Sequence, residues 1–255
     1  MALLTLNDLR YNMQQYFAFN REELQGVIIA IIGMSIIIGF NDGAPPPFDF
    51  LRWAGNLISV ILIVTLAYLA QESAKRVMGL WWGYRVEYKV FYPGLVLGFM
   101  ITVMTLGKYW FWWILLPSGI VLHTIEGQRL VYFRHFLRYW DLGVVALLGP
   151  LANILLALFF KFLYILMPTN TLLDLAIKIN IMLAIGTLLP IPPMAGHNIL
   201  YASRWLYFIM LGIAITLAIL FVIPGLSIYF ILTGVVAGAI LGLAFFVFVV
   251  QSKLM

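Results

Sequence analysis

The chain has 255 residues, of which 64% are hydrophobic and 10% are charged, with a mean hydropathy of +1.04 and a formal net charge of +5. A soluble domain carries roughly 45–50% apolar and about 25% charged residues, so this composition excludes a soluble domain and indicates an integral membrane protein. The absence of cysteine excludes disulfides, thiolate metal sites and cysteine nucleophiles. The basic residues sort by membrane side, which predicts topology rather than a nucleic-acid partner.

The chain begins with a polar and aromatic segment. Met1–Asn20 has no continuous apolar stretch before a small-residue cleavage site, so we expect no cleavable signal peptide. Leu3–Tyr16 is predicted to lie on the membrane surface as a short amphipathic helix.

Several apolar stretches are long enough to cross a bilayer, since a helix needs roughly 20 apolar residues to span about 30 Å of hydrocarbon. They are Leu24–Phe40, Trp53–Ala70, Leu142–Met167, Leu172–Pro190, Trp205–Ile223 and Leu226–Val250. We therefore predict an all-α polytopic fold, a single membrane domain over residues 1–255 with about six transmembrane helices. The bilayer is the first partner that this fold implies.

A further apolar region, Phe91–Ile125, is interrupted by glycine, proline and Lys108. It either spans the membrane or re-enters from one face. With re-entry, eleven of the fifteen Lys and Arg residues share a side, and only Arg52 and Lys178 lie opposite. The eleven are Arg10, Arg21, Lys75, Arg76, Arg85, Lys89, Arg129, Arg134, Arg138, Arg204 and Lys253. We favour re-entry, and the positive-inside rule then places both termini in the cytoplasm of a plasma-membrane protein.

Two motifs stand out from generic membrane sequence. Residues 148–153 read Leu-Gly-Pro-Leu-Ala-Asn, and residues 188–196 read Leu-Leu-Pro-Ile-Pro-Pro-Met-Ala-Gly, downstream of Asn180. They resemble the Gly-Pro-x-x-Asn and Pro-x-Pro-Pro-Leu-Asp-Gly motifs of the site-2 protease family, the intramembrane zinc metalloproteases. The likeness, which includes features of archaeal members, covers residues 17–200, and residues 201–255 would add two C-terminal transmembrane helices.

The resemblance implies a zinc-binding His-Glu-x-x-His at the end of the second span, where i and i+4 share a helix face. This chain reads Gln71-Glu72-Ser73-Ala74-Lys75 there, and Ala195 takes the place of the third ligand, an aspartate. Glu72 is then the remnant of the general base, and Gln71, Lys75 and Ala195 are degenerate ligand positions. A lysine ammonium donates hydrogen bonds and accepts none, so it repels zinc. We expect no bound zinc and no other cofactor.

Two roles are open for Lys75. Residues three apart on a helix are close enough to pair, so Lys75 can neutralise Glu72 where the family holds its metal. Alternatively, Lys75 extends to the cytoplasmic interface beside Arg76.

The resemblance also implies a substrate-binding cleft. Its residues would be Asn153, Asn180, Pro190, Pro192 and Pro193. Hydrogen bonding between helices is an equal alternative for the two asparagines, because amide side chains are costly in lipid. Thr187 replaces an asparagine of the family pattern, which weakens substrate handling.

A metal site rebuilt elsewhere is a remote alternative. His123, Glu126 and His197 carry suitable donor atoms, and His123 and Glu126 have the i, i+3 spacing of one helical turn. The plainer interpretation is a polar tip on the re-entrant segment and an interfacial histidine.

Three functions follow. The first is a catalytically inactive member of the site-2 protease family that binds another membrane protein or a transmembrane helix. The second is a working intramembrane metalloprotease with an unorthodox site. The third, a transporter or channel subunit, would need a polar path through the spans, for which Lys161, Asp174 and Lys178 are candidates, although Asp174 and Lys178 can simply pair with each other.

Overall fold

The computed structural model describes residues 6–41, 47–108, 119–124, 138–222 and 228–251. The elements within these ranges are α1 (Leu6–Tyr16), α2 (Arg21–Ile38), α3 (Phe50–Trp81), β1 (Tyr84–Lys89), α4 (Tyr92–Thr105), β2 (Gly119–Thr124), α5 (Tyr139–Leu166), α6 (Thr171–Thr187), α7 (Ala195–Ala202), α8 (Arg204–Val222), α9 (Ile228–Phe245) and the π-helical turn η3 (Phe246–Val250). The all-α polytopic class predicted from the sequence is confirmed, with one small sheet in addition.

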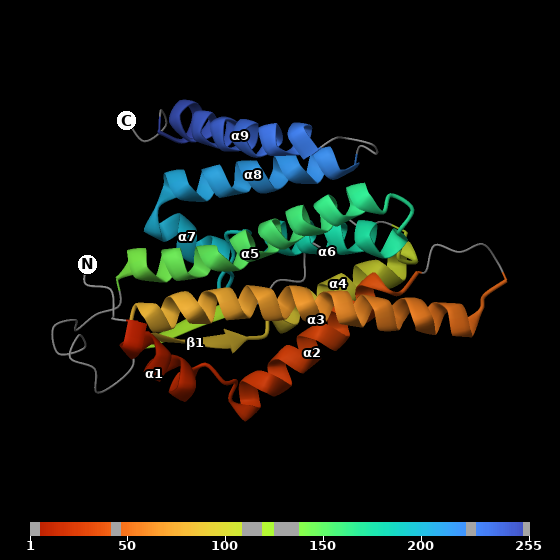
Figure 1. Cartoon of the computed structure of the whole chain (residues 1–255), viewed down its shortest axis with the longest axis horizontal. Helices are drawn as coiled ribbons and strands as arrows, with labels where there is room; N and C mark the ends of the chain where they lie inside the picture. Colours follow the sequence, from red (N-terminus) through yellow and green to blue (C-terminus); the bar gives the residue numbers. More distant parts are fainter. Residues whose placement is uncertain (1–5, 42–46, 109–118, 125–137, 223–227, 252–255) are drawn as a thin grey trace.

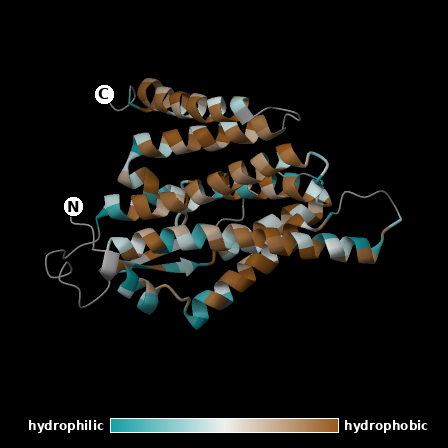
Figure 2. Ribbon diagram, viewed as in Figure 1, coloured by the Kyte–Doolittle hydropathy of each residue, from teal (hydrophilic) through white to brown (hydrophobic). Residues whose placement is uncertain are grey.

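Within the described ranges, four helices are long and apolar enough to cross a membrane: Phe50–Trp81, Tyr139–Leu166, Arg204–Phe221 and Tyr229–Val250. Each coincides with a predicted span. The other two predicted spans correspond to α2 and α6, which have 18 and 17 residues, and α2 begins with Arg21, Glu22 and Glu23. Crossing by α2 and α6 therefore remains a prediction. Figure 2 shows this pattern, with hydrophobic residues along most helices and hydrophilic ones on α1 and at the start of α2.

Local capping explains where several helices begin. The carboxylate of Asp49 accepts hydrogen bonds from the backbone N–H groups of Leu51 and Arg52 at the start of α3. The side chain of Asn170 likewise accepts from the N–H of Leu172 at the start of α6. Such side chains satisfy backbone donors that have no partner within the helix.

The helices form layers around two hydrophobic cores. In Figure 1, α8 and α9 lie on one side, α5, α6 and α7 lie in the middle, and α3, β1, α1 and α2 lie on the other side. One core joins α5, α6, α7 and α8, and the other joins α2, α3 and α6. Residues 176–187 of α6 contribute to both cores and are all buried except Lys178.

The small sheet determines the path of the predicted re-entrant segment. Strand β1 pairs with β2 in antiparallel register, with Tyr84 opposite Thr124 and Lys89 opposite Gly119. The chain therefore leaves β1 through α4 and comes back beside the point that it left, which agrees with re-entry. Tyr84, Val86 and Tyr88 are buried on one face of β1, in the alternation typical of a strand.

The first and last described helices reach the same end of the bundle, although they belong to opposite outer layers. Helix α1 confirms the short N-terminal helix predicted from the sequence, and in Figure 1 it lies at the same end of the bundle as the C-terminal end of α9. This arrangement agrees with termini on one side of the membrane. That this side is the cytoplasm remains a prediction.

The last two long helices are held together by glycines. A Cβ atom on Gly242 would lie 2.1 Å from the carbonyl oxygen of Phe208, and one on Gly238 would lie 2.7 Å from that of Gly212. Backbone therefore contacts backbone between α8 and α9, as small residues allow in membrane helices.

Candidate functional site

The Glu72–Lys75 ion pair lies inside the protein, on α3. Each side chain is only 1% exposed, and the Nζ atom of Lys75 lies 2.5 Å from Oε1 of Glu72. The pairing predicted from the i, i+3 spacing is therefore present, and Lys75 does not extend to the interface. A charge that is buried without a counter-charge costs roughly several kcal/mol of folding free energy. Each member of this pair therefore needs the other to remain charged inside the protein.

A hydrogen bond between helices occupies the neighbouring position. Nδ2 of Asn153 on α5 donates to Oε1 of Gln71 on α3 over 2.7 Å, and both side chains are buried. Gly149 lies one turn earlier on α5, where a Cβ atom would be 3.2 Å from Gln71 Cγ and 3.2 Å from Lys75 Cδ. The Gly-Pro-x-x-Asn motif thus packs directly against Gln71 and Lys75, the positions that the sequence resemblance assigns to two metal ligands.

These residues do not fit a zinc ion. The Gln71 amide oxygen accepts a hydrogen bond from Asn153, one Glu72 oxygen is paired with an ammonium group, and Ala195 offers no donor atom. Zinc in proteins takes imidazole, thiolate and carboxylate ligands, usually four in number. Within the described ranges, no group of three or more His, Cys, Asp or Glu residues is placed to hold a metal.

The second motif forms the turn between α6 and α7. Ala195 is buried at the start of α7, and a Cβ atom on Gly196 would lie 2.1 Å from the carbonyl oxygen of Leu188. Only glycine allows this approach. Before it, Pro190 and Pro192 are exposed and Pro193 is half-buried. The proline stretch therefore lies on the surface and leads into the buried Ala195, the position that the sequence resemblance assigns to the third metal ligand.

The two asparagines assigned to a cleft have different surroundings. Asn153 makes the interhelical bond to Gln71, whereas Nδ2 of Asn180 donates to the carbonyl oxygen of Ala176 in its own helix. Both side chains are fully buried, and the Oδ1 atom of each has no hydrogen-bond partner in the structure. The hydroxyl of Thr187 also bonds within α6, to the carbonyl oxygens of Leu183 and Ala184.

The remote metal alternative is not assembled from the residues that can be placed. Nε2 of His123 on β2 lies 3.0 Å from Oε2 of Glu87 on β1. His197 packs its ring on Tyr201 in α7, with 4.6 Å between ring centroids. Glu126 lies outside the described residues. Asp174 and Lys178, the candidates for a transport path, form a partly exposed local pair at 2.6 Å.

A second buried ion pair was not predicted. Nη2 of Arg76 lies 3.0 Å from Oε1 of Glu23, which also accepts a hydrogen bond from the backbone N–H of Tyr88. The guanidinium further donates to the carbonyl oxygen of Phe17 and lies 3.9 Å from the ring centroid of Phe19. This network joins the start of α2 to α3 and β1. The predicted span ends at Ala70, before Arg76; the structure instead buries Arg76 in this pairing, and α3 continues eleven residues past that predicted end.

Tyrosines surround the two ion pairs. Tyr84 donates to Oδ2 of the buried Asp141 over 2.7 Å, and Tyr68 and Tyr88 meet edge to face. Burial raises the pKa of Tyr88 well above its usual range, and the charge of Glu72 adds to the effect. The alternation of residues 84–89 (Tyr-Arg-Val-Glu-Tyr-Lys) is the sequence signal that predicts this strand.

The comparisons agree with this site only in part. No family model matches the chain, and no solved structure matches it. The chain is 27% identical over 197 residues to a protein of Methanocaldococcus jannaschii named "Putative zinc metalloprotease MJ0611", which covers 76% of this chain and 89% of that protein. This similarity supports a metalloprotease-like family. The chain is a membrane protein that is similar to a protein named as a zinc metalloprotease. Its own residues at the relic positions nevertheless differ from a zinc-binding set.

Proposed function

We propose that the chain is a catalytically inactive, site-2-protease-like membrane protein that binds a transmembrane helix of another membrane protein. The observation that carries this proposal is the buried ion pair between Lys75 and Glu72. A metalloprotease needs a metal-activated water and a free carboxylate base. Here the ammonium group lies against that carboxylate, so the base has no open path to a water proton.

The rest of the relic site supports the loss of metal. The amide oxygen of Gln71 already accepts a hydrogen bond from Asn153, and Ala195 is buried with only a methyl side chain. An aspartate at position 195 without a dication would be a buried, uncompensated charge. The three departures therefore stabilise one another in the absence of zinc.

The proposed binding surface is the proline segment before α7. Ile191 is 45% exposed and lies between the exposed Pro190 and Pro192. Proline provides no backbone N–H, so this segment presents its carbonyl oxygens and apolar side chains to a neighbour.

Elemental analysis of the purified protein tests the loss of metal. We expect zinc far below one atom per chain in protein purified without chelator and supplied with zinc during expression. A folded chain with one zinc atom would overturn this part of the proposal.

Site-specific photo-crosslinking tests the binding. A photoreactive residue at position 191 should give a discrete crosslinked product with an integral membrane protein. The same residue at Val236, which is exposed on the outer face of α9, is the control and should give only diffuse lipid products. Equal products from both positions would contradict a binding surface at the proline segment.

The name of the relative favours a second candidate, an active intramembrane metalloprotease with a non-standard site. It predicts cleavage of a transmembrane substrate that stops on chelation and on Glu72→Gln substitution. We expect neither, because Lys75 holds the glutamate. Chelator-sensitive cleavage that depends on Glu72 would reverse the choice between the two functions.

A further inference from the structure

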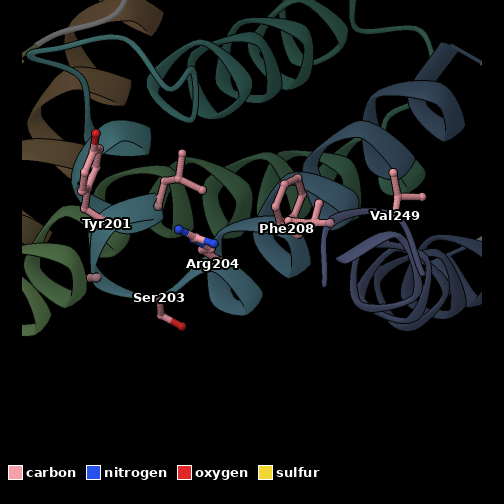
Figure 3. Close-up of a pocket in the computed structure, with 8 residues that line it drawn as sticks. Tyr201, Ser203, Arg204, Phe208 and Val249 are labelled. Carbon is pink, nitrogen blue, oxygen red and sulfur yellow. The ribbon is translucent and has the colours of Figure 1, made fainter. Parts of the chain in front are cut away.

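A pocket of about 750 Å³ lies at the other end of α7 from Ala195, where α7 joins α8 and the end of α9 approaches them. Its lining residues are Leu200, Tyr201, Ala202, Ser203, Arg204, Phe208, Val249 and Val250. Figure 3 shows Tyr201, Ser203 and Arg204 toward one end and Val249 toward the other, with Phe208 between Arg204 and Val249. The pocket therefore has a polar end and an apolar end.

The polar end has the chemistry of an anion site. Arg204 is exposed, and among the described residues no carboxylate lies within ion-pair distance of it. Ser203 is 8% exposed, and its hydroxyl oxygen has no hydrogen-bond partner. Arg204 is also the first residue of α8, a helix of 19 residues whose first-turn N–H groups have no partner within the helix. A free guanidinium, a free buried hydroxyl and a helix N-terminus all favour negative charge.

The apolar end is lined by α8 and the π-helical turn. Val249 and Val250 belong to η3, and Phe208 lies against Phe246 of the same turn with 6.1 Å between ring centroids. The wider π turn changes the direction of these side chains relative to a continued α-helix, and such turns are frequent at functional sites. This wall suits a hydrocarbon chain and offers nothing to a free inorganic ion.

We propose that this pocket binds one anionic phospholipid. The phosphate would lie against the guanidinium of Arg204 at the start of α8, and an acyl chain would follow Phe208 toward Val249. An anionic lipid also agrees with the predicted topology. Arg204 belongs to the basic residues predicted on the cytoplasmic side, and the anionic lipids of that leaflet attract such residues. This binding does not depend on the proposed function.

Native mass spectrometry of the detergent-purified protein tests the proposal. Phosphatidylglycerol is titrated in parallel with phosphatidylcholine of the same acyl chains and with inorganic phosphate. We expect one tightly bound phosphatidylglycerol, weaker phosphatidylcholine, and no phosphate at matched concentrations. Arg204→Gln should weaken the phosphatidylglycerol site roughly tenfold or more, because a charge-assisted hydrogen bond is lost.

Two further variants separate the site from general charge and folding effects. Arg21→Gln removes an exposed arginine on the same predicted membrane side, at the start of α2, and should leave the bound lipid unchanged. Val249→Trp should fill the apolar end and reduce phosphatidylglycerol binding with Arg204 intact. Equal lipid binding by wild type and Arg204→Gln, equal affinity for the two lipids, or phosphate binding as tight as lipid binding would each overturn the proposal.

Discussion

The ammonium nitrogen of Lys75 lies 2.5 Å from a carboxylate oxygen of Glu72, one helical turn away and out of contact with solvent. The pair places a fixed positive charge at a position that the resemblance to the site-2 proteases assigns to a metal ligand. Its partner, Glu72, is the residue that the same resemblance assigns to the general base. Under the proposed function, these two charges stabilise the fold and exclude metal-dependent hydrolysis.

Removing one member of this pair should destabilise the protein. Lys75→Met leaves Glu72 buried without a counter-charge, and breaking such a pair costs roughly 3–5 kcal/mol. Thermal unfolding in detergent, followed by intrinsic tryptophan fluorescence, measures the loss. The double variant Glu72→Gln with Lys75→Met removes both charges and should unfold close to the wild-type temperature. A single variant as stable as the wild type would show that the pair contributes nothing.

The second ion pair should hold the N-terminal region in place. Glu23→Gln removes the charge that Arg76 contacts and weakens the acceptor for the Tyr88 N–H. We expect faster hydrogen exchange at the start of α2 and in β1, with the C-terminal helices unchanged. Glu22→Gln is the matched control, since Glu22 is exposed on the same turn. Identical exchange in the two variants would argue against the network.

The glycine contact between α8 and α9 should not accept a side chain. Gly242→Ala places a methyl group against the carbonyl of Phe208, and overpacking of this kind costs about 1–3 kcal/mol. Gly55→Ala on α3 is the control, because nothing lies within 4 Å of a Cβ atom there. The unfolding temperature should fall for the first variant and stay equal or rise for the second. Equal unfolding temperatures for the two variants would mean that α8 and α9 can move apart without a cost in the free energy of folding.

Restoring the donor atoms should restore metal binding. The triple variant Gln71→His, Lys75→His and Ala195→Asp supplies two imidazoles on one helix face and a carboxylate from the turn before α7. We expect about one zinc per chain by elemental analysis of this variant, and almost none in the wild type. The variant with Gln71→His and Lys75→His alone lacks the third ligand and should retain less. A metal-free triple variant would mean that the turn before α7 is too far from α3.

The transmembrane segments could be predicted from the sequence because they depend on local composition. The predicted span Leu142–Met167 and the observed α5, Tyr139–Leu166, differ by three residues at one end and one at the other. The end of α3 could not be predicted in this way. Its last turns carry charges, and only their partners, such as Glu23 at a distance of 53 residues, allow the helix to continue inside the protein.

The candidate site could likewise be predicted only where its contacts join residues that are close in sequence. Helical spacing made the Glu72–Lys75 pair one of two predicted roles for Lys75, whereas the Asn153–Gln71 bond joins residues 82 apart and was not predicted. The sheet was missed because β1 and β2 are six residues each, and their pairing depends on a return of the chain that short patterns do not encode. The side chain of Asn180 bonds to the backbone of its own helix and not to a neighbouring helix. Sequence spacing does not distinguish these two kinds of acceptor.

The contacts of Gln71 and Lys75 also constrain how this protein can change over time. Lys75→His alone leaves Glu72 without its permanent positive partner, and Gln71→His alone removes the acceptor used by Asn153. Ala195→Asp alone buries a new carboxylate. Each single step toward a metal site is therefore unfavourable before any metal can compensate, because fewer than three ligands hold zinc weakly. Under the proposed function, a lineage in this state is separated from proteolysis by a barrier of unstable intermediates, and selection can act on its other surfaces without catalysis returning.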